Sequence, residues 1–157
     1  MSIEYPYLPE GREIKFVPED NEFMVAAKEI SMQAADKQHP TGAVIVKNKE
    51  IIGRGCNYAF IGTFPFLIKT HFKWCVRRLF KVPSGQKYWA CPGCIPSKNH
   101  AESRSVRDAI KHGYDRSGAD LYLWGHWWCC KTCWDYMIDG NIENVYLAEG
   151  SQSLFNR

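Results

Sequence analysis

The sequence lacks any long apolar run. Its most apolar stretch, AFIGTFPFLI at residues 59–68, contains a glycine and a proline. It is also far shorter than the roughly 20 apolar residues that a membrane-spanning helix needs. The start of the chain lacks the charged, apolar and small-residue segments of a signal peptide. We therefore expect no contact with a membrane and a cytoplasmic location.

The sequence also lacks the even number of cysteines that a complete disulfide framework requires. It has seven cysteines, which is many for a cytoplasmic protein, and four of them form the Cys-x-x-Cys pairs Cys91/Cys94 and Cys130/Cys133. Two cysteines at this spacing can bind one metal ion together. The cysteine pattern therefore indicates metal binding.

Acidic residues are absent from residues 58–98. This segment holds seven lysines and arginines, so the rest of the chain has 13 basic and 17 acidic residues and a formal charge of −4. A positive segment on an otherwise acidic protein favours a partner that carries phosphate groups.

The chain has the length and composition of one globular domain, without repeats or low-complexity segments. Residues 1–18, with prolines at positions 6, 9 and 18, are expected to form an arm, and residues 19–157 the domain. Sequence periodicity predicts helices at about 19–39, 99–113 and 130–140, and strands at 43–47, 51–57, 120–124 and 143–148. This order predicts an α/β fold, in which helices pack against a mixed sheet.

Four residues at the starts of two predicted helices can carry chemistry. His100 and Glu102 open one helix. Cys130 and Cys133 open the next. One imidazole and two thiolates form a three-ligand zinc set, which leaves a position open for water, as catalytic zinc sites do. Glu102 could take the proton of that water and pass it to a substrate nitrogen and then to a leaving amine. The pattern thus predicts hydrolytic deamination.

These residues resemble the signature of the zinc-dependent cytidine and deoxycytidylate deaminases, in which His-x-Glu precedes Pro-Cys-x-x-Cys. The matching residues are HAE at 100–102 and CCKTC at 129–133. GAVIVKNKEIIGRGCN at 42–57 looks like the first hairpin of that family, and the resemblance extends from about Glu19 to Ala148. It implies a single three-layer α/β/α domain with a mixed central sheet, and association into homo-oligomers.

The resemblance also implies roles for the matched residues. The implied ligands of a catalytic Zn²⁺ are His100, Cys130 and Cys133. Glu102 would be the catalytic proton carrier. The implied substrate contacts are Asn57, at the sugar, and Ala101, Thr41, Gly42 and Ala43, near the base; for Asn57, a plain turn residue is the alternative. The implied reaction converts a cytosine nucleotide or nucleoside, such as dCMP, to its uracil form with release of ammonia.

The sequence departs from the family pattern at Cys129, where proline is usual. A cysteine here adds a thiol and a backbone N–H next to the metal ligands, so Cys129 could compete with Cys130 for the metal. Trp127 and Trp128, which precede it, are also unusual for the family. They could pack in the core or wall the base pocket by stacking.

The basic segment at about 58–98 is an insert with two alternative uses. Four basic residues recur at intervals of four and would form one stripe on a continuous helix: Lys69, Lys73, Arg77 and Lys81. Candidate stacking side chains are Tyr58, Phe60, Phe64 and Trp89. Together they could bind single-stranded DNA or RNA, whose bases would then be the substrate. The alternative is an amphipathic helix that only packs on the domain.

The insert also contains a second metal-binding pattern. HFKWC at 71–75 and CPGC at 91–94 supply the ligand types of a structural zinc site: His71, Cys75, Cys91 and Cys94. Four protein ligands close the coordination sphere of Zn²⁺, which would hold a segment that has little core of its own. Cys56 is a further candidate ligand.

A third function is a catalytically silent, zinc-stabilised module that binds nucleic acid or protein. The additional cysteines and the change at Cys129 favour it. Glu102 argues against it, because a purely structural zinc site needs no such carboxylate. For an enzyme, free nucleotide, nucleoside and polymer remain alternative substrates.

Overall fold

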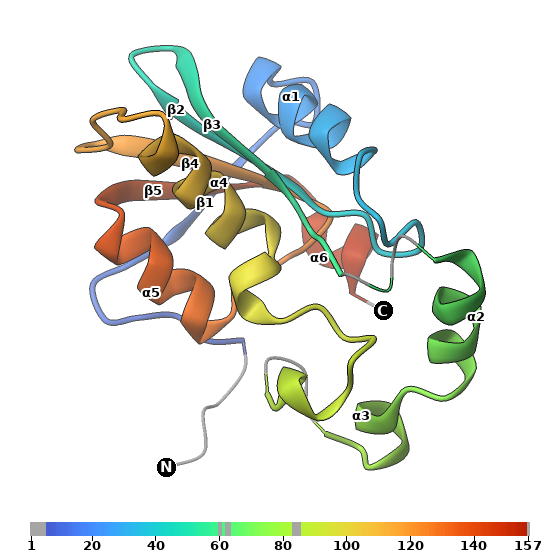
Figure 1. The fold of residues 1–157 in the computed structure, drawn as a ribbon. Helices are drawn as coiled ribbons and strands as arrows, with labels where there is room; N and C mark the ends of the chain where they lie inside the picture. Colours follow the sequence, from blue (N-terminus) through green and yellow to red (C-terminus); the bar gives the residue numbers. More distant parts are fainter. Residues whose placement is uncertain (1–5, 60, 62–63, 83–85, 157) are drawn as a thin grey trace.

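The structure, a computed structural model, describes residues 6–59, 61, 64–82 and 86–156. Five strands form one sheet in the order β1-β5-β4-β2-β3 (Figure 1). Strands β1, β5 and β4 are parallel, whereas β2 is antiparallel to both β4 and β3. The strands are β1 (Ile14–Val17), β2 (Gly42–Lys47), β3 (Glu50–Cys56), β4 (Ala119–Trp124) and β5 (Ile142–Ala148). The predicted α/β class with a mixed sheet is confirmed.

Helices cover both faces of the sheet and give the expected three layers (Figure 1). On one face lies α1 (Glu22–Ser31), whose buried Met24 packs in one cluster with Val44 and Tyr122 of the sheet. The other face is covered by α4 (Ala101–Lys111) and α5 (Lys131–Asp139), whose buried side chains join those of β4 and β5 in the larger core cluster. A short helix, α6 (Ser151–Phe155), follows β5. Strand β2 is apolar along most of its length because both of its faces are covered.

The hairpin of β2 and β3 turns at Asn48 and Lys49, as predicted. Both residues have positive φ angles, 51° and 65°. Two successive left-handed residues form the hairpin turn whose twist matches that of the paired strands, and asparagine tolerates this conformation well. Gly42 consequently pairs with Cys56, so the residues on either side of the hairpin meet at one end of the sheet.

Two glycines of β3 allow α4 to lie directly on the sheet. A Cβ atom on Gly55 would overlap the backbone of Ala101 and Ser105, and a Cβ atom on Gly53 would overlap that of Ser105. The absence of side chains lets the two backbones approach closely. His100, which immediately precedes α4, is thereby placed next to the end of β3.

The N-terminal segment and α1 differ from the sequence prediction. The segment expected to be an arm contains β1, which pairs with β5 over four residues. Helix α1 ends at Ser31, well before residue 39. The Asp36 carboxylate accepts hydrogen bonds from the backbone N–H groups of Gln38 and His39, which stabilises a turn in place of helix.

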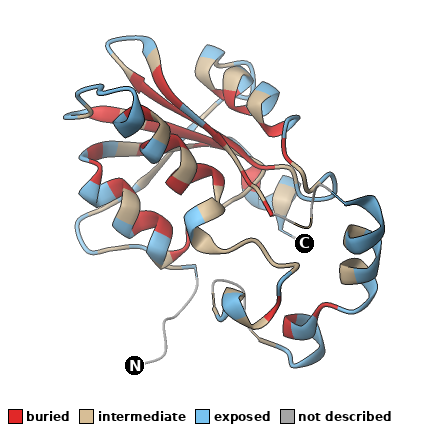
Figure 2. Cartoon of the chain, in the orientation of Figure 1, coloured by how far each residue is buried: buried red, intermediate tan, exposed pale blue. Residues whose placement is uncertain are grey.

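The insert is mostly exposed or half-buried (Figure 2). Its elements are α2 (Pro65–Lys73), α3 (Val76–Leu79) and the 3₁₀ helices η2 (Tyr88–Ala90) and η3 (Ser97–Asn99). The predicted continuous basic stripe is wrong, because the helix breaks at Trp74 and Cys75 and Arg77 is buried. Phe60 lies outside the described residues. None of the helices in the described part of the chain is long and apolar enough to cross a bilayer.

Candidate metal and catalytic site

Three metal-binding side chains from two helix starts meet at one end of the sheet. His100 precedes α4, Cys130 precedes α5, and Cys133 lies in the first turn of α5. Nδ1 of His100 lies 3.3 Å from Sγ of Cys133 and 3.7 Å from Sγ of Cys130. All three ligand atoms lie within 4.8 Å of one another. The structure therefore brings the three predicted ligands together.

The distances from His100 to the two cysteines fit a zinc ion. Nitrogen and sulfur ligands of tetrahedral zinc, bound at about 2.0 and 2.3 Å, lie about 3.6 Å apart, which is close to both distances from His100. The two sulfur atoms lie 2.9 Å apart, closer than the about 3.8 Å between two sulfur ligands of tetrahedral zinc, because they share a hydrogen bond here. The hydrogen bond between them lowers the pKa of Cys130 to about 4, despite the opposing effect of burial. Cys130 therefore favours the thiolate form, whereas burial and the same hydrogen bond raise the pKa of Cys133 well above its ordinary value.

The other side of the His100 ring is held by the insert. Nε2 of His100 donates a hydrogen bond of 3.2 Å to the carbonyl oxygen of Ile95. A neutral ring that donates from Nε2 has a free lone pair on Nδ1, the atom that faces the cysteines. The Tyr88 ring packs edge-on against His100, with the ring centroids 5.2 Å apart. Two residues of the insert therefore orient this ligand.

Glu102 lies in the first turn of α4 and is only 5% exposed. Burial raises the pKa of its carboxyl group above the ordinary value, although the nearby His100 opposes this shift. A raised pKa brings a carboxylate closer to the range in which it accepts and releases protons near neutral pH. The group is therefore suited to proton transfer.

Cys129 does not join this group of ligands. Its side chain is fully buried. Burial, reinforced by the charge of Glu102 and a hydrogen bond to it, raises the pKa of the Cys129 thiol well above its ordinary value. Cys129 is also absent from the group of residues at His100 whose ligand atoms lie within 4.8 Å of one another. Cys129 is therefore a neighbour of Glu102, and the two cysteines that cluster with His100 are Cys130 and Cys133.

A pocket of about 320 Å³ opens beside the ligands. Glu102 lines it, together with three of the five residues expected to contact the substrate: Thr41, Asn57 and Ala101. The other two, Gly42 and Ala43, are buried in β2, outside the lining of this pocket.

Asn57 is buried in the pocket wall and holds a neighbouring loop. Its Oδ1 accepts a hydrogen bond of 3.1 Å from the N–H of Thr41, and its Nδ2 donates one of 2.9 Å to the carbonyl oxygen of His39. These bonds fix residues 39–41 against the end of β3. The amide group of Asn57 therefore shapes the pocket through this loop.

His126 lines the pocket but was not identified from the sequence. Its Nδ1 accepts hydrogen bonds of 3.1 and 3.3 Å from the backbone N–H groups of Trp127 and Trp128. Burial lowers the pKa of His126 to about 4, so the ring is neutral at pH 7 and carries its proton on Nε2. Its position between β4 and the metal-binding cysteines is the sequence signal that could have pointed to it.

The two tryptophans are placed differently. Trp128 is buried in the core and also lines the pocket, so both alternatives hold for it. Trp127 packs against the core and is absent from the residues that line the pocket.

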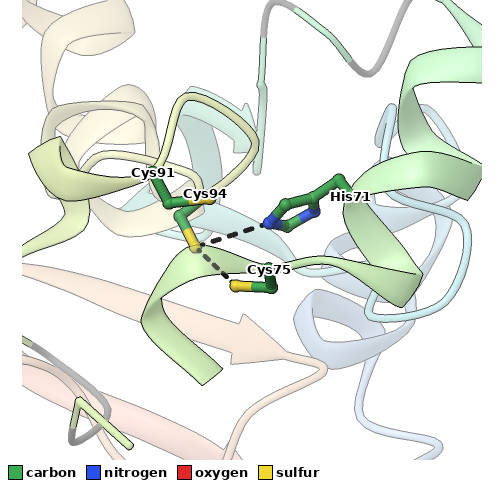
Figure 3. Close-up of side chains that lie close together, drawn as sticks. All are labelled: His71, Cys75, Cys91 and Cys94. Carbon is green, nitrogen blue, oxygen red and sulfur yellow. Dashed lines mark hydrogen bonds between the residues drawn. The ribbon is translucent and has the colours of Figure 1, made fainter. Parts of the chain in front are cut away.

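A second group of metal-binding side chains lies in the insert (Figure 3). Its four ligand atoms, all within 4.8 Å of one another, belong to His71, Cys75, Cys91 and Cys94. Sγ of Cys94 lies 3.6 Å from Nε2 of His71 and 3.6 Å from Sγ of Cys75. Among the described residues, this group and the one at His100 are the two with three or more such ligands, and Cys56 belongs to neither.

The insert cluster also suits zinc. A Cβ atom on Gly93 would overlap the His71 ring, so the glycine of CPGC permits the ring to approach the cysteines. Burial acts to raise the pKa of Cys75, but hydrogen bonds from Arg78, Cys94 and His71 outweigh it and lower this pKa to about 6. All seven cysteines of the chain are free of disulfide bonds.

Comparison with known proteins is consistent with this geometry. The sequence model of the "Cytidine and deoxycytidylate deaminase zinc-binding region" matches residues 17–149. The structure of dCMP deaminase from cyanophage S-TIM5 in apo form is similar, with a TM-score of 0.52 and 20% identity over 85% of this chain and 86% of that one. The same enzyme in complex with dCMP and dUMP gives a TM-score of 0.50 and 18% identity over 84% of each chain. No curated protein matches the sequence significantly.

Proposed function

The chain belongs to the cytidine and deoxycytidylate deaminase family, and we propose that it is a zinc-dependent hydrolase that converts a cytosine nucleotide or nucleoside to its uracil form. The observation that carries this proposal is the position of Glu102. Its buried carboxyl group lines the same pocket as two of the three clustered metal-binding residues, His100 and Cys130.

Each of these groups has a chemical task in the proposed reaction. Zinc held by His100, Cys130 and Cys133 would act as a Lewis acid and activate water for attack on carbon 4 of cytosine. The carboxylate of Glu102 takes one proton from the attacking water and delivers it to ring nitrogen 3, where it stays; it then carries the second proton of that water, from the new hydroxyl at carbon 4, to the departing amino group. Water is consumed and ammonia is released, so no other reactant is needed.

The pocket supplies contacts that would hold a pyrimidine. The buried Trp128 offers an aromatic face or edge to the base. The Nε2–H group of His126 can donate a hydrogen bond to a substrate oxygen. The cyanophage enzyme whose structure contains dCMP and dUMP makes a deoxynucleotide of this kind the first substrate to test.

The test is ammonia release by zinc-loaded protein. The substrates are cytidine, deoxycytidine, their monophosphates and a single-stranded oligonucleotide. Glu102→Gln should keep its zinc and lose at least about 10²-fold in turnover. Glu29→Gln, the same change on the exposed side of α1, should behave as wild type. Full activity of Glu102→Gln would contradict the proposed role, and no turnover of any substrate by the wild type would favour a zinc-stabilised binding module.

A polymeric substrate is the second candidate, because the insert exposes aromatic and basic side chains together. Its exposed aromatic residues include Phe66, Trp74, Phe80 and Trp89. Its exposed basic residues include Lys69, Lys73 and Lys81. Such surfaces bind single strands by stacking and by phosphate contacts. Turnover of the oligonucleotide alone, with binding that weakens steeply as salt increases, would favour this candidate over a free nucleotide.

A further inference from the structure

The interior of the insert consists largely of its metal-binding cluster. Helix α2 has no buried residue. Across the described residues of 64–98, the buried ones are Cys75, Arg77 and Cys91. A segment that buries so little apolar surface cannot hold its shape by packing alone. A bound metal ion would supply the missing cross-links between α2, α3 and the CPGC loop.

The charges around the cluster suit zinc. Three thiolates and one neutral imidazole give a zinc complex with a net charge of −1. Arg77 lies beside it: its Nη1 donates a hydrogen bond of 3.4 Å to Sγ of Cys94, and its Nε donates one of 2.8 Å to the carbonyl oxygen of Gln86. The buried guanidinium therefore offsets the charge of the filled cluster.

Two chains of contacts lead from this cluster to His100. Through the backbone, Cys94 is followed by Ile95, whose carbonyl oxygen accepts the hydrogen bond from Nε2 of His100. Through side chains, the guanidinium of Arg77 lies 4.2 Å from the ring centroid of Tyr88, and Tyr88 packs edge-on against His100. The contacts of His100 with Ile95 and with Tyr88 thus both come from residues that the insert cluster positions.

We propose that the insert cluster binds a structural zinc ion, and that this ion orients His100 and thereby strengthens metal binding at His100, Cys130 and Cys133. The inference rests on the proposed function only in taking those three residues as the site of the second zinc. Partners that orient a ligating histidine typically contribute 10–100-fold, about one to two orders of magnitude, to metal affinity. Coupling between two binding sites is reciprocal, so zinc at either site must strengthen the other by the same factor.

The first test removes the insert zinc with the double variant Cys75→Ser/Cys91→Ser, which leaves Cys94 in contact with Arg77. Zinc per chain should fall from two to one, measured by mass spectrometry of metals. Competition with a chromophoric chelator should show that the remaining zinc is held about 10–100-fold more weakly than the catalytic zinc of the wild type. Cys56→Ser, a matched change outside both clusters, should retain two zinc ions with wild-type affinities.

The second test runs the coupling in reverse and remains informative if the first variant does not fold. Cys130→Ser/Cys133→Ser should keep the insert zinc, but bind it more weakly by the same factor. A single zinc ion in the fully loaded wild type would overturn the proposal, as would an unchanged affinity of the remaining zinc in either double variant. Two coupled zinc ions in a protein that releases no ammonia would overturn the proposed function and leave this inference standing.

Discussion

The two His/Cys clusters use similar ligands on different scaffolds. The cluster at His100 has three ligands, held by the starts of α4 and α5 against the sheet, with the buried Glu102 beside it in a pocket. The insert cluster has four ligands, held by short helices and a loop on a largely exposed segment. Three protein ligands leave zinc an open position for chemistry, whereas four close it.

The two clusters differ both in the number of ligands and in the parts of the chain that hold those ligands in place. A catalytic ligand must be held to within a fraction of an ångström, and the tight packing of α4 on Gly53 and Gly55 provides this at one side of His100. The other side depends on Ile95 and Tyr88 of the insert. The four-ligand cluster of the insert therefore helps to orient His100 in the three-ligand cluster.

The largest expected effect is a difference in zinc content and turnover between variants of the adjacent residues Cys129 and Cys130. Cys130→Ser should remove the zinc of the three-ligand cluster and reduce ammonia release by at least about 10³-fold. Cys129→Ser should retain that zinc, because Cys129 lies outside the group of clustered ligand atoms. Metal content and turnover of both variants check this. Loss of zinc from Cys129→Ser and not from Cys130→Ser would reverse the assignment of ligands.

The next effect concerns the shape of the insert. In Cys75→Ser/Cys91→Ser, protease cleavage within residues 64–98 should become at least about tenfold faster, because the cross-links of the cluster are lost. Circular dichroism should show that the sheet remains folded, since the core clusters lie outside these residues. Mass spectrometry of the fragments locates the cuts. Equal cleavage rates in the variant and in Cys56→Ser would show that the cluster does not shape the insert.

A smaller effect is expected at His126. His126→Asn keeps a hydrogen-bond acceptor near the position of Nδ1 but removes the Nε2–H group that can reach the substrate. KM should rise about tenfold, the value of one hydrogen bond, while zinc content stays unchanged. Steady-state kinetics measure this, with His112→Asn at the exposed end of α4 as the control. An unchanged KM would remove His126 from the substrate contacts.

The smallest effect is a pH dependence of stability. Unfolded chains protonate His126 below its ordinary pKa of 6.5, whereas the buried ring resists protonation down to about 4. The unfolded state therefore binds more protons between pH 4 and 6.5. The contribution of His126 to the free energy of unfolding thus falls as the pH decreases from 6.5 to 4, and it is constant above pH 6.5. Urea unfolding at matched zinc content should show a smaller decline for His126→Asn than for the wild type. Parallel declines would contradict the burial of a neutral ring.

The parts of the fold that were predictable are those specified by local sequence. The turn at Asn48 and Lys49, the helix after His100 and both Cys-x-x-Cys patterns depend on neighbouring residues, and each has the predicted local structure. Strand β1 was missed because four residues show too little periodicity, and its partner β5 lies far along the chain. The early end of α1 depends on the turn at Asp36, which competes with the helix.

The parts of the site that were missed depend on long-range contacts. Spacing alone indicated the ligands, but not that Ile95 holds His100 or that Asn57 holds the loop at His39. The break between α2 and α3 turns Arg77 inward, which no count of charges could show. Homo-oligomerisation, which the family resemblance implies, stays a prediction for light scattering to test.

The central claim is that the metal has an open position in the three-ligand cluster at His100 and none in the four-ligand cluster of the insert. The most direct test is the visible absorption of cobalt-substituted protein during titration with azide. Cys75→Ser/Cys91→Ser holds Co²⁺ at the three-ligand cluster, and azide should shift its spectrum by entering the open position. Cys130→Ser/Cys133→Ser holds Co²⁺ at the four-ligand cluster, where azide should change nothing. A spectrum that does not respond in the first variant, or that responds in the second, would contradict the assignment of the two clusters.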